Sequence, residues 1–328
     1  ITTNAKPEEI KKIFPKSFYE NKFLTVTVQT GSKNEKLKEI EVTTFRTEAK
    51  YTDKRHPDEI RFAKTIEEDL ARRDFTVNAI AIGQKIENRR QKIEVVDPFG
   101  GQEDLKNKII RAVGRAEERF NEDALRMMRA VRLAVILGFE IEKETAEAIQ
   151  KNSVWIKHIS QERARDELLK IIMSERAMEG VELLRKLSLL RYILPELEEG
   201  YEVGQNKHHI YSCYEHNLKS LDFTAKKGFN KQVRLAALFH DIAKPRVKSG
   251  EGVDSTFYGH EIVGAKITYQ ILNRLKFSKK DIEKIVKLVR YHLFYYNVDE
   301  VGEASVRRLV RQVGLENMEE LLQLRMAD

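Results

Sequence analysis

One charged stretch of this chain runs directly into an apolar segment, with the sequence Glu67-Glu68-Asp69-Leu70-Ala71-Arg72-Arg73-Asp74-Phe75-Thr76-Val77-Asn78-Ala79-Ile80-Ala81-Ile82. Adjacent guanidiniums, such as those of Arg72 and Arg73, bind phosphate groups through paired hydrogen bonds. A carboxylate can fix such a pair, and the apolar segment can support it from a folded core. The stretch therefore indicates a pocket for the phosphates and ribose of a nucleotide.

A second charged segment lies about forty residues further on, with the sequence Asn121-Glu122-Asp123-Ala124-Leu125-Arg126-Met127-Met128-Arg129-Ala130-Val131-Arg132. Helix residues three apart share a face, so Asp123, Arg126 and Arg129 are predicted to lie on one helical stripe. A carboxylate accepts a hydrogen bond from an exocyclic amine, and an arginine donates one to a ring nitrogen. Cytosine and adenine meet both demands on their Watson–Crick edges, whereas guanine and uracil do not. The segment thus predicts a selector for CTP and ATP.

A solvated helix face is the alternative for this second segment. Its ion pairs between neighbouring turns would each be worth about a few tenths of a kcal/mol. In isolation, the Glu-Asp-x-x-Arg pattern favours that alternative. Its coupling to the Arg72-Arg73 stretch favours the nucleotide pocket instead.

These motifs resemble those of the class II tRNA nucleotidyltransferases and bacterial poly(A) polymerases, within the DNA polymerase β nucleotidyltransferase superfamily. The resemblance extends over nearly the whole chain and is carried by residues 40–46, 72–78, 97–105, 122–132 and 159–168. It implies an α+β fold with a nucleotidyltransferase head, built on an incomplete antiparallel or mixed sheet. A mostly helical neck, body and C-terminal module would come after this head.

The implied reaction adds nucleotides from CTP and ATP to the 3′ end of tRNA and releases pyrophosphate. In this scheme three carboxylates, of which Glu41 is the third, hold two Mg²⁺ ions that activate the attacking hydroxyl and stabilise the departing pyrophosphate. Glu41 would point away from the apolar face of its strand because side chains alternate along a strand. The alternative for Glu41 is an ordinary solvent-facing strand residue.

The resemblance also implies roles for the other charged residues. The nucleotide would be contacted by Arg72, Arg73, Asp74 and Asn78. Asp123 and Arg126 would select the base. Their helix would be oriented by Glu122, Arg129, Glu162 and Arg163. Arg132, together with lysines and arginines of the helical body, would grip tRNA phosphates.

Two departures from the family pattern affect these expectations. The family begins with a Gly-Gly turn, an Arg-Asp pair and a D-x-D whose carboxylates hold magnesium, whereas residues 1–10 resemble the family's segment immediately after the D-x-D. We therefore expect the chain to be an internal portion of a longer protein, truncated at both ends, and to transfer no nucleotide alone. Leu24 stands where the family often has glycine, and a bulky residue there would hinder close approach of the backbone.

Composition limits the class of protein. With 328 residues, two or more modules are expected, and 59 Lys and Arg against 52 Asp and Glu favour a polyanionic partner. A single cysteine, Cys213, excludes an intramolecular disulfide and a cysteine-rich zinc site, and is expected to fill the core. The chain has no run of eighteen apolar residues, so we expect no membrane segment and a cytoplasmic location.

Hydrophobic patterns place the strands near the N-terminus. Strands are predicted over residues 25–30, 39–45, 77–82 and 93–96. Helices are predicted over residues 6–14 and 66–72, and residues 47–63 are predicted to form a mobile loop that includes His56. From Asp123 onward the pattern is helical. We expect a head over residues 1–112, a neck and body over 113–205, and a helical domain over 206–328.

A second group of histidines and aspartates lies in that last domain, and comprises His216, His240, Asp241, His260, His292 and Asp328. Imidazole nitrogens and carboxylate oxygens can hold one or two divalent metals that activate water against a phosphoester. The order resembles the HD phosphohydrolase superfamily and implies a second divalent metal, Ni, Mn, Co, Zn or Fe. Alternatively, these residues are a scaffold that only supports tRNA binding, and His209 could take the place of His216.

Three rival functions stay open on the sequence alone. A poly(A) polymerase shares these motifs, and so does an enzyme that adds only CC or only A. From another class comes an HD phosphohydrolase with an RNA-binding front half. The sequence leaves the oligomeric state open.

Overall fold

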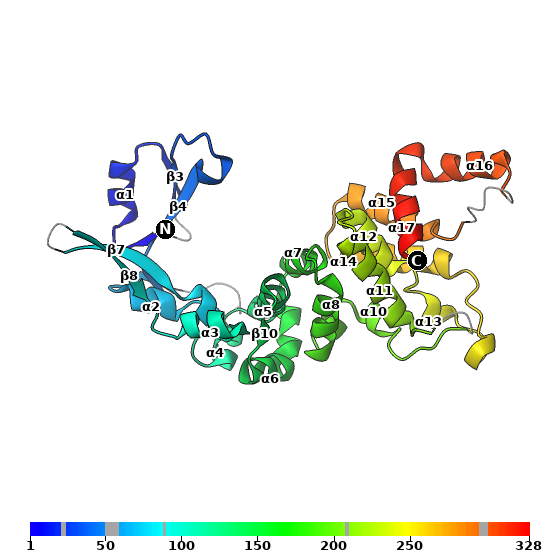
Figure 1. Ribbon diagram of the computed structural model, residues 1–328, viewed down its shortest axis with the longest axis horizontal. Coiled ribbons are helices and arrows are strands. Elements are labelled where there is room, and N and C mark those ends of the chain that lie inside the picture. Colours follow the sequence, from blue (N-terminus) through cyan, green and yellow to red (C-terminus); the bar gives the residue numbers. More distant parts are fainter. Residues whose placement is uncertain (21–23, 50–58, 88–89, 207–209, 295–300) are drawn as a thin grey trace. The chain divides into compact units, whose positions relative to one another are not determined.

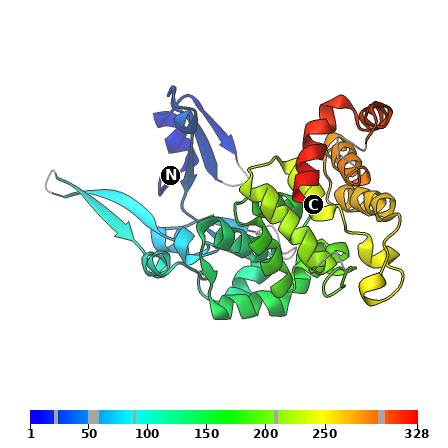
Figure 2. The same cartoon turned by 45° about the vertical axis from the view of Figure 1, so that its right-hand side comes forward.

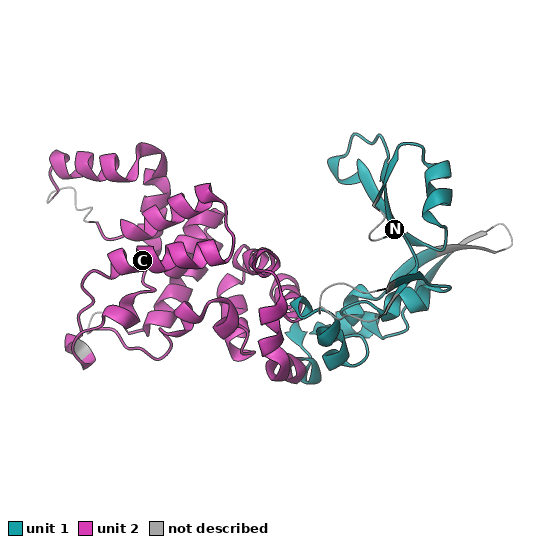
Figure 3. Ribbon diagram, turned by 180° about the vertical axis from the view of Figure 1, so that it is seen from behind, with its two compact units in different colours: residues 1–126, 140–145 teal, residues 127–139, 146–328 magenta. Residues whose placement is uncertain are grey.

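The computed structural model describes residues 1–328 except 21–23, 50–58, 88–89, 207–209 and 295–300. The chain forms two compact units, of which unit 1 comprises residues 1–126 and 140–145, and unit 2 comprises residues 127–139 and 146–328 (Figure 3). Strands and short helices build unit 1, whereas unit 2 is helical (Figure 1). The predicted α+β fold is confirmed, with the strands in the N-terminal part of the chain.

The main sheet of unit 1 has four strands in the order β1-β4-β3-β2. Their bounds are Thr2–Thr3 for β1, Ser17–Glu20 for β2, Thr25–Gln29 for β3 and Glu39–Thr44 for β4. Antiparallel pairing joins β2, β3 and β4, while β1 runs parallel to β4. The predicted strands at residues 25–30 and 39–45 are therefore confirmed, and the sheet is mixed.

Alternating side chains of this sheet bury one apolar face. Val26 and Val28 of β3 and Val42 of β4 pack with Ile10 of helix α1, Pro7–Ile13. Proline at the start of α1 is tolerated because the first N–H groups of a helix need no intrahelical partner. Glu41, between Ile40 and Val42, is exposed on the opposite face, as predicted from the alternation.

Two further antiparallel pairs of strands lie in unit 1. Arg46–Ala49 (β5) pairs with Glu59–Phe62 (β6), so the prediction of a loop throughout residues 47–63 is wrong. These strands are polar and show little alternation of apolar and polar residues, so the sequence pattern did not predict them. His56 lies outside the described residues.

The second pair joins Ala81–Glu87 (β7) to Arg90–Val96 (β8), and Figure 2 shows these two long strands side by side. The prediction of a strand over residues 77–82 is wrong at its start, because Thr76–Asn78 form a 3₁₀ turn, η3, and β7 begins at Ala81. Asp74 accepts a hydrogen bond from the side chain of Asn78 and the next residue's N–H, so local side-chain bonds favour the turn.

Helix α2, Ile66–Ala71, begins at Thr65, whose hydroxyl accepts a hydrogen bond from the N–H of Glu68. Its Leu70 packs with Ala79 and Val113 in the second apolar core of unit 1. The rest of unit 1 comprises η2 (Glu35–Leu37), α3 (Gly101–Asn107), α4 (Ala116–Glu122), and β9 (Ile109–Ile110) paired with β10 (Glu140–Ile141). Gly101 is required here because a Cβ would collide with the Thr76 carbonyl oxygen.

Unit 2 contains helices and no strands among its described residues. Its first helices are α5 (Leu125–Leu137, entering from unit 1), α6 (Lys143–Asn152), η4 (Ser153–His158), α7 (Gln161–Ile172), α8 (Ala177–Lys186), α9 (Leu190–Ile193) and α10 (Pro195–Glu198). Expected breaks occur at Gly138, which has a positive φ, and at Pro195, which begins α10.

The later helices of unit 2 are α11 (Cys213–Lys226), α12 (Lys231–Phe239), α13 (Lys244–Val247), η5 (Gly252–Asp254), α14 (His260–Arg274), α15 (Lys279–Arg290), α16 (Glu303–Val313), η6 (Leu315–Asn317) and α17 (Met318–Ala327). Helices α11, α12, α15 and α17 pack together (Figure 1). Cys213 is buried, as expected for a core residue. Among the described residues, no helix combines the length and apolarity needed to cross a membrane.

Candidate functional site

An open cavity of about 840 Å³ lies within unit 1. Glu41 of β4 lines it, and so do Arg72 and Arg73, which come directly after helix α2. An apolar wall is supplied by Ile80, Ala81, Ile82 and Val96. The structure thus brings three sequence-predicted residues to one cavity. The two arginines lie about thirty residues after Glu41 in the sequence.

The two arginines are held by a buried carboxylate, that of Asp69. Its Oδ1 accepts hydrogen bonds of 2.7 and 3.1 Å from Nη2 and Nε of Arg72, and its Oδ2 lies 3.2 Å from Nη2 of Arg73. Sequence reasoning did not single out Asp69, although its spacing of three and four residues from the arginines is a signal for such contacts on a helix.

Asp74 and Asn78 occupy the turn after the arginines. Asp74 is buried, and its Oδ1 accepts hydrogen bonds from the N–H of Phe75 at 2.9 Å and from Nδ2 of Asn78 at 3.2 Å. Its carbonyl oxygen also accepts from the N–H of Val113. These bonds fix the shape of the turn that carries Arg72 and Arg73.

The predicted helical stripe of Asp123, Arg126 and Arg129 is wrong in one respect. Asp123 is not helical: it lies between α4 and α5 with φ −145° and ψ 105°. Its Oδ1 accepts a 3.0 Å hydrogen bond from the N–H of Leu125. An aspartate that comes just before a helix stabilises it by accepting a hydrogen bond from an otherwise unpaired N–H. This bond favours a non-helical backbone at the aspartate itself, so α4 and α5 do not form one continuous helix.

Arg126 lies in the first turn of α5 and connects the two charged segments. Its Nη1 is 2.6 Å from Oε2 of Glu122, and its Nη2 donates a 3.2 Å hydrogen bond to the carbonyl oxygen of Arg72. Glu122 also pairs with Arg119 at 2.5 Å. Glu122 therefore holds the guanidinium of Arg126.

The other four sequence-predicted residues, Arg129, Arg132, Glu162 and Arg163, lie in unit 2. Arg132 Nε is 2.6 Å from Oε2 of Glu167, a buried carboxylate that also pairs with Lys170. Sequence reasoning missed Glu167 because no local pattern links residues so far apart. Glu162 lies in the first turn of α7.

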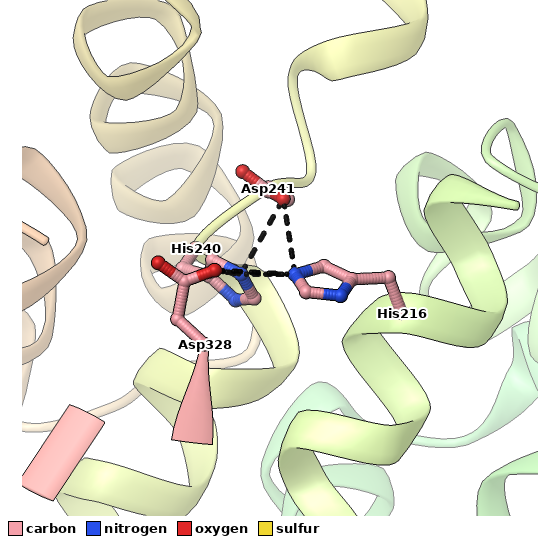
Figure 4. A group of neighbouring side chains, drawn as sticks. All are labelled: His216, His240, Asp241 and Asp328. Carbon is pink, nitrogen blue, oxygen red and sulfur yellow. Dashed lines mark hydrogen bonds and ion pairs between the residues drawn. The ribbon is translucent and has the colours of Figure 1, made fainter. Parts of the chain in front are cut away.

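The six residues of the second group do come together within unit 2. Nε2 of His216, on α11, lies 3.0 Å from Nε2 of His240 and 3.3 Å from carboxylate oxygens of both Asp241 and Asp328 (Figure 4). His240 and Asp241 come directly after α12, and Asp328 comes directly after α17. These four residues offer ligand atoms that all lie within 4.8 Å of one another.

A second set shares Asp241. Nε2 of His260, the first residue of α14, is 3.1 Å from Asp241 Oδ1, and Nε2 of His292, just after α15, is 3.7 Å from the same oxygen. Together, Asp241, His260 and His292 form another group with the spacing of metal ligands. His208 and His209 lie outside the described residues.

Backbone carbonyls set the tautomers of these imidazoles. Nδ1 of His240, His260 and His292 lies 2.7–2.8 Å from the carbonyl oxygens of Ala237, Phe257 and Val289. A carbonyl can only accept, so each Nδ1 carries the proton, which directs the Nε2 lone pair of a neutral ring inward. Nε2 of His260 and of His292 are buried without a hydrogen-bond partner among the described residues.

Electrostatics of the cluster also suit a cation. Burial lowers the pKa of His240, but the carboxylates of Asp241 and Asp328 raise it to about 10. Burial raises the pKa of Asp241, yet His240 and the other imidazoles hold it well below its usual range. Lys244, buried three residues after Asp241, places Nζ 2.5 Å from Asp241 Oδ2 and 2.7 Å from Gln205 Oε1. Lys244 and a protonated His240 therefore balance these carboxylates in this structure, and a divalent metal bound to neutral imidazoles would take the place of the imidazolium charge.

The inward lone pairs, buried carboxylates and ligand spacing therefore fit a divalent metal in this group. Unit 1 differs. Among the described residues that line its cavity, Glu41 is the only carboxylate. One carboxylate does not fit a site for two magnesium ions, which needs several oxygen ligands from the protein.

Three family models match the chain in succession. The poly A polymerase head domain matches residues 1–111, the probable RNA and SrmB- binding site of polymerase A matches residues 138–200, and the HD domain matches residues 213–327. The protein thus joins a polymerase-type head, through a helical region, to an HD domain. These matches confirm the resemblance of its motifs to the tRNA nucleotidyltransferases and bacterial poly(A) polymerases that carry an HD domain.

Curated relatives have similar sequences. The A-adding tRNA nucleotidyltransferase of Deinococcus radiodurans is 36% identical over 272 residues, covering 80% of this chain and 60% of that protein. The CCA-adding enzyme of Listeria monocytogenes serotype 4b is 46% identical over 199 residues, covering 61% of this chain and 48% of that protein. The chain therefore spans less than two thirds of the length of these relatives.

Solved structures share the fold. The Bacillus stearothermophilus CCA-adding enzyme in complex with CTP matches 99% of this chain and 68% of its own, with 28% identity and a TM-score of 0.69. The Thermotoga maritima CCA-adding enzyme complexed with tRNA matches 99% of this chain and 68% of its own, with 19% identity and a TM-score of 0.60, a likeness of fold alone.

Proposed function

We propose that this chain is part of a tRNA nucleotidyltransferase that adds the 3′-terminal CCA from CTP and ATP and releases pyrophosphate. One observation carries the proposal: Glu41, Arg72 and Arg73 line the same cavity, although a long stretch of sequence separates the carboxylate from the arginines. Support also comes from the relatives, which are named for CCA addition and A addition, and from the solved structure with CTP.

In this proposal, the guanidiniums of Arg72 and Arg73 bind the triphosphate, because two adjacent forks can meet oxygens of successive phosphates. Arg73 suits this role because it lines the cavity and 37% of its side chain is exposed. The turn formed by Asp74 and Asn78 holds the arginines at the cavity and contributes to the nucleotide site.

Base selection is assigned to Asp123 and Arg126. Asp123 caps α5 rather than lying on it, so the pair acts from a helix start and its first turn. Glu122 orients Arg126. Arg129, Glu162 and Arg163 are proposed to support this segment.

Magnesium would activate the attacking 3′-hydroxyl and stabilise the leaving pyrophosphate. Glu41 is proposed as one of its ligands. Because Glu41 is the only carboxylate among the described residues lining the cavity, transfer needs further carboxylates from elsewhere in a longer protein. This chain's own residues bind and orient the nucleotide.

Transfer RNA is proposed as the acceptor. The formal charge of +7 favours a polyanion, and residues 138–200 match a family model described as a probable RNA-binding site. Exposed Lys151 and Lys157 lie in that region. Arg132 is proposed to contact phosphate, a role in which RNA would compete with Glu167 for its guanidinium.

The direct test is incorporation of labelled CTP and ATP into tRNA that lacks its CCA end, with a longer protein that includes this chain. Incorporation of both nucleotides supports CCA addition. Incorporation of ATP alone into tRNA ending in CC supports an A-adding enzyme, and ATP tracts on unrelated RNA support a poly(A) polymerase. No incorporation of either nucleotide contradicts the proposal.

A second candidate activity belongs to the HD domain. The observation that favours it is the shared carboxylate of Asp241, which stands between two groups of ligand atoms. We propose that these residues hold one or two divalent metals, such as Ni, Mn, Co, Zn or Fe, and thereby hydrolyse phosphoesters. Metal-dependent cleavage of 2′,3′-cyclic phosphates tests this activity, and its loss in His240→Ala, with no change in nucleotide binding, would separate it from transfer.

A further inference from the structure

The carboxylate of Asp69 is completely buried, yet it contacts the two guanidiniums that line the cavity. One oxygen, Oδ1, serves Arg72, and the other, Oδ2, serves Arg73. A rigid planar carboxylate that accepts from both arginines fixes the distance and the angle between their guanidiniums. Since Asp69 has no exposed surface, a bound nucleotide would meet the arginines and not the carboxylate.

A third contact ties this carboxylate to the strand region that carries Glu41. The N–H of Arg46 donates a 3.2 Å hydrogen bond to Asp69 Oδ1, and Nε of Arg72 donates one of 3.1 Å to the Arg46 carbonyl oxygen. Arg46 begins β5, two residues after the end of β4 at Thr44. Asp69 therefore connects the arginine pair with the segment that comes after the strand of Glu41.

The charge balance leaves the arginines able to bind an anion. Burial raises the pKa of Asp69, but Arg72, Arg73 and the N–H of Arg46 lower it below its ordinary value. The carboxylate is thus ionised at neutral pH, and a single negative charge opposes two guanidiniums. The pair keeps a net positive charge toward the cavity, and little side-chain entropy remains to be lost on binding.

We propose that Asp69 is a positioning residue that holds Arg72 and Arg73 as a preformed clamp for the triphosphate of the incoming nucleotide. This inference rests on the proposed function of the cavity. It assigns the geometry of the clamp to a side chain that never touches the nucleotide. Truncation of the clamp arginines would remove contacts, whereas a change at Asp69 would remove only their arrangement.

The test compares binding of CTP and CMP to the 328-residue chain and to Asp69→Asn, by calorimetry with Mg²⁺ present. Asparagine keeps the size of the side chain but loses the charge and one acceptor. We expect CTP affinity to fall by about tenfold or more, as for loss of a charge-assisted pair, and CMP affinity to change by less than about twofold. Only the triphosphate reaches the whole clamp.

Asp104→Asn is the matched control. Asp104 is also buried in unit 1 and pairs with Arg111 at 3.1 Å and with the hydroxyl of Thr76 at 2.6 Å, so its carboxylate holds an arginine that does not line the cavity. Asp104→Asn should leave the CTP-to-CMP affinity ratio unchanged. Equal losses for CTP and CMP in Asp69→Asn, or the same loss of CTP affinity in both variants, would show general destabilisation and overturn the proposal.

A second readout does not depend on nucleotide binding. In protein labelled with ¹⁵N-arginine, a clamped guanidinium rotates slowly and gives separate Nη signals. We expect such signals for Arg72 in the parent chain and their collapse in Asp69→Asn, but not in Asp104→Asn. Unchanged arginine signals in Asp69→Asn overturn the positioning role. If those signals collapse but the parent chain binds no CTP or ATP, the proposed function fails while the positioning role stands.

Discussion

The guanidinium of Arg126 donates a 3.2 Å hydrogen bond to the backbone carbonyl oxygen of Arg72. In sequence these residues belong to separate motifs, one proposed to read the base and the other to bind phosphates. The bond joins the motifs within unit 1, where Arg119 also donates to the carbonyl oxygen of Ala71. The residue proposed to select the base thus helps to hold the turn that carries the arginines proposed to bind phosphate.

This connection leads to the first prediction, on nucleotide selectivity. In a longer, active protein, Asp123→Ala or Arg126→Ala should reduce discrimination between CTP or ATP and GTP or UTP by roughly 1–3 kcal/mol, since each would remove a proposed hydrogen-bond partner of the base. The measurement is kcat/KM for each of the four nucleoside triphosphates. Arg115→Ala, which removes an exposed pair with Glu118, is the control. Unchanged selectivity in both test variants would refute the assignment.

The second prediction concerns transfer by the 328-residue chain itself. Glu41 alone cannot hold two magnesium ions, so labelled CTP and ATP should not be incorporated into tRNA lacking its CCA end. The same preparation should still bind CTP, because Arg72 and Arg73 are present. A longer protein that supplies a Gly-Gly turn and a D-x-D should regain transfer. Turnover by the 328-residue chain would show that other carboxylates suffice.

A third prediction comes from the backbone at Leu24, which has a φ of +54°. A non-glycine residue in this left-handed region destabilises the folded state by about 1–2 kcal/mol. Glycine avoids this strain, but its greater conformational entropy in the unfolded chain offsets part of the gain. Leu24→Gly should therefore raise the free energy of unfolding by about 1 kcal/mol or less. Urea unfolding is the measurement, and Leu24→Ala, which keeps Cβ, should give no such gain.

Arg234 provides the fourth prediction. Its buried guanidinium donates to the carbonyl oxygens of Ile172, Ser174, Ala225 and Phe229. Arg234→Met should destabilise unit 2 by roughly 3 kcal/mol or more, because buried carbonyls would lose their donors at about 1–3 kcal/mol each. Arg308→Met, at an exposed position of α16, is the control. Equal unfolding midpoints for the two variants would contradict this role.

Sequence patterns predicted those elements whose signals are local. Strict alternation identified β3 and β4 and placed Glu41 on the open face, and Pro7 marked the start of α1. Where polar side chains compete for the backbone, the patterns failed. Asp74 and Asn78 stabilise a 3₁₀ turn instead of a strand, and Asp123 caps α5 instead of joining it.

The candidate sites differ in how far sequence could define them. Motif order brought out the residues of the HD domain, because a metal needs particular ligand types whatever their separation. Residues that only position another side chain can be of many types, so no residue pattern identifies them. Glu167 meets Arg132 through tertiary packing alone, whereas Asp69 and Lys244 lie one turn from the residues they hold, a spacing that many surface pairs share.

The last prediction concerns metal in the HD domain. Four ligand atoms from His216, His240, Asp241 and Asp328 converge, and the Nδ1 proton of His240 is held by a carbonyl. Purified protein should therefore contain stoichiometric divalent metal, and its removal by a chelator should lower the unfolding temperature, because an ion bound only by the folded state stabilises that state.

Re-addition of Mn²⁺ or Ni²⁺ should restore the unfolding temperature of the parent chain but not that of His240→Ala. His158→Ala, which changes an exposed histidine outside the cluster, should respond like the parent. His292→Ala separates the two groups, since it removes a ligand from the Asp241–His260–His292 set and leaves the other four residues intact. If none of the proteins contains metal and added metal shifts none of their unfolding temperatures, the histidines and aspartates are a scaffold, and the domain supports tRNA binding alone.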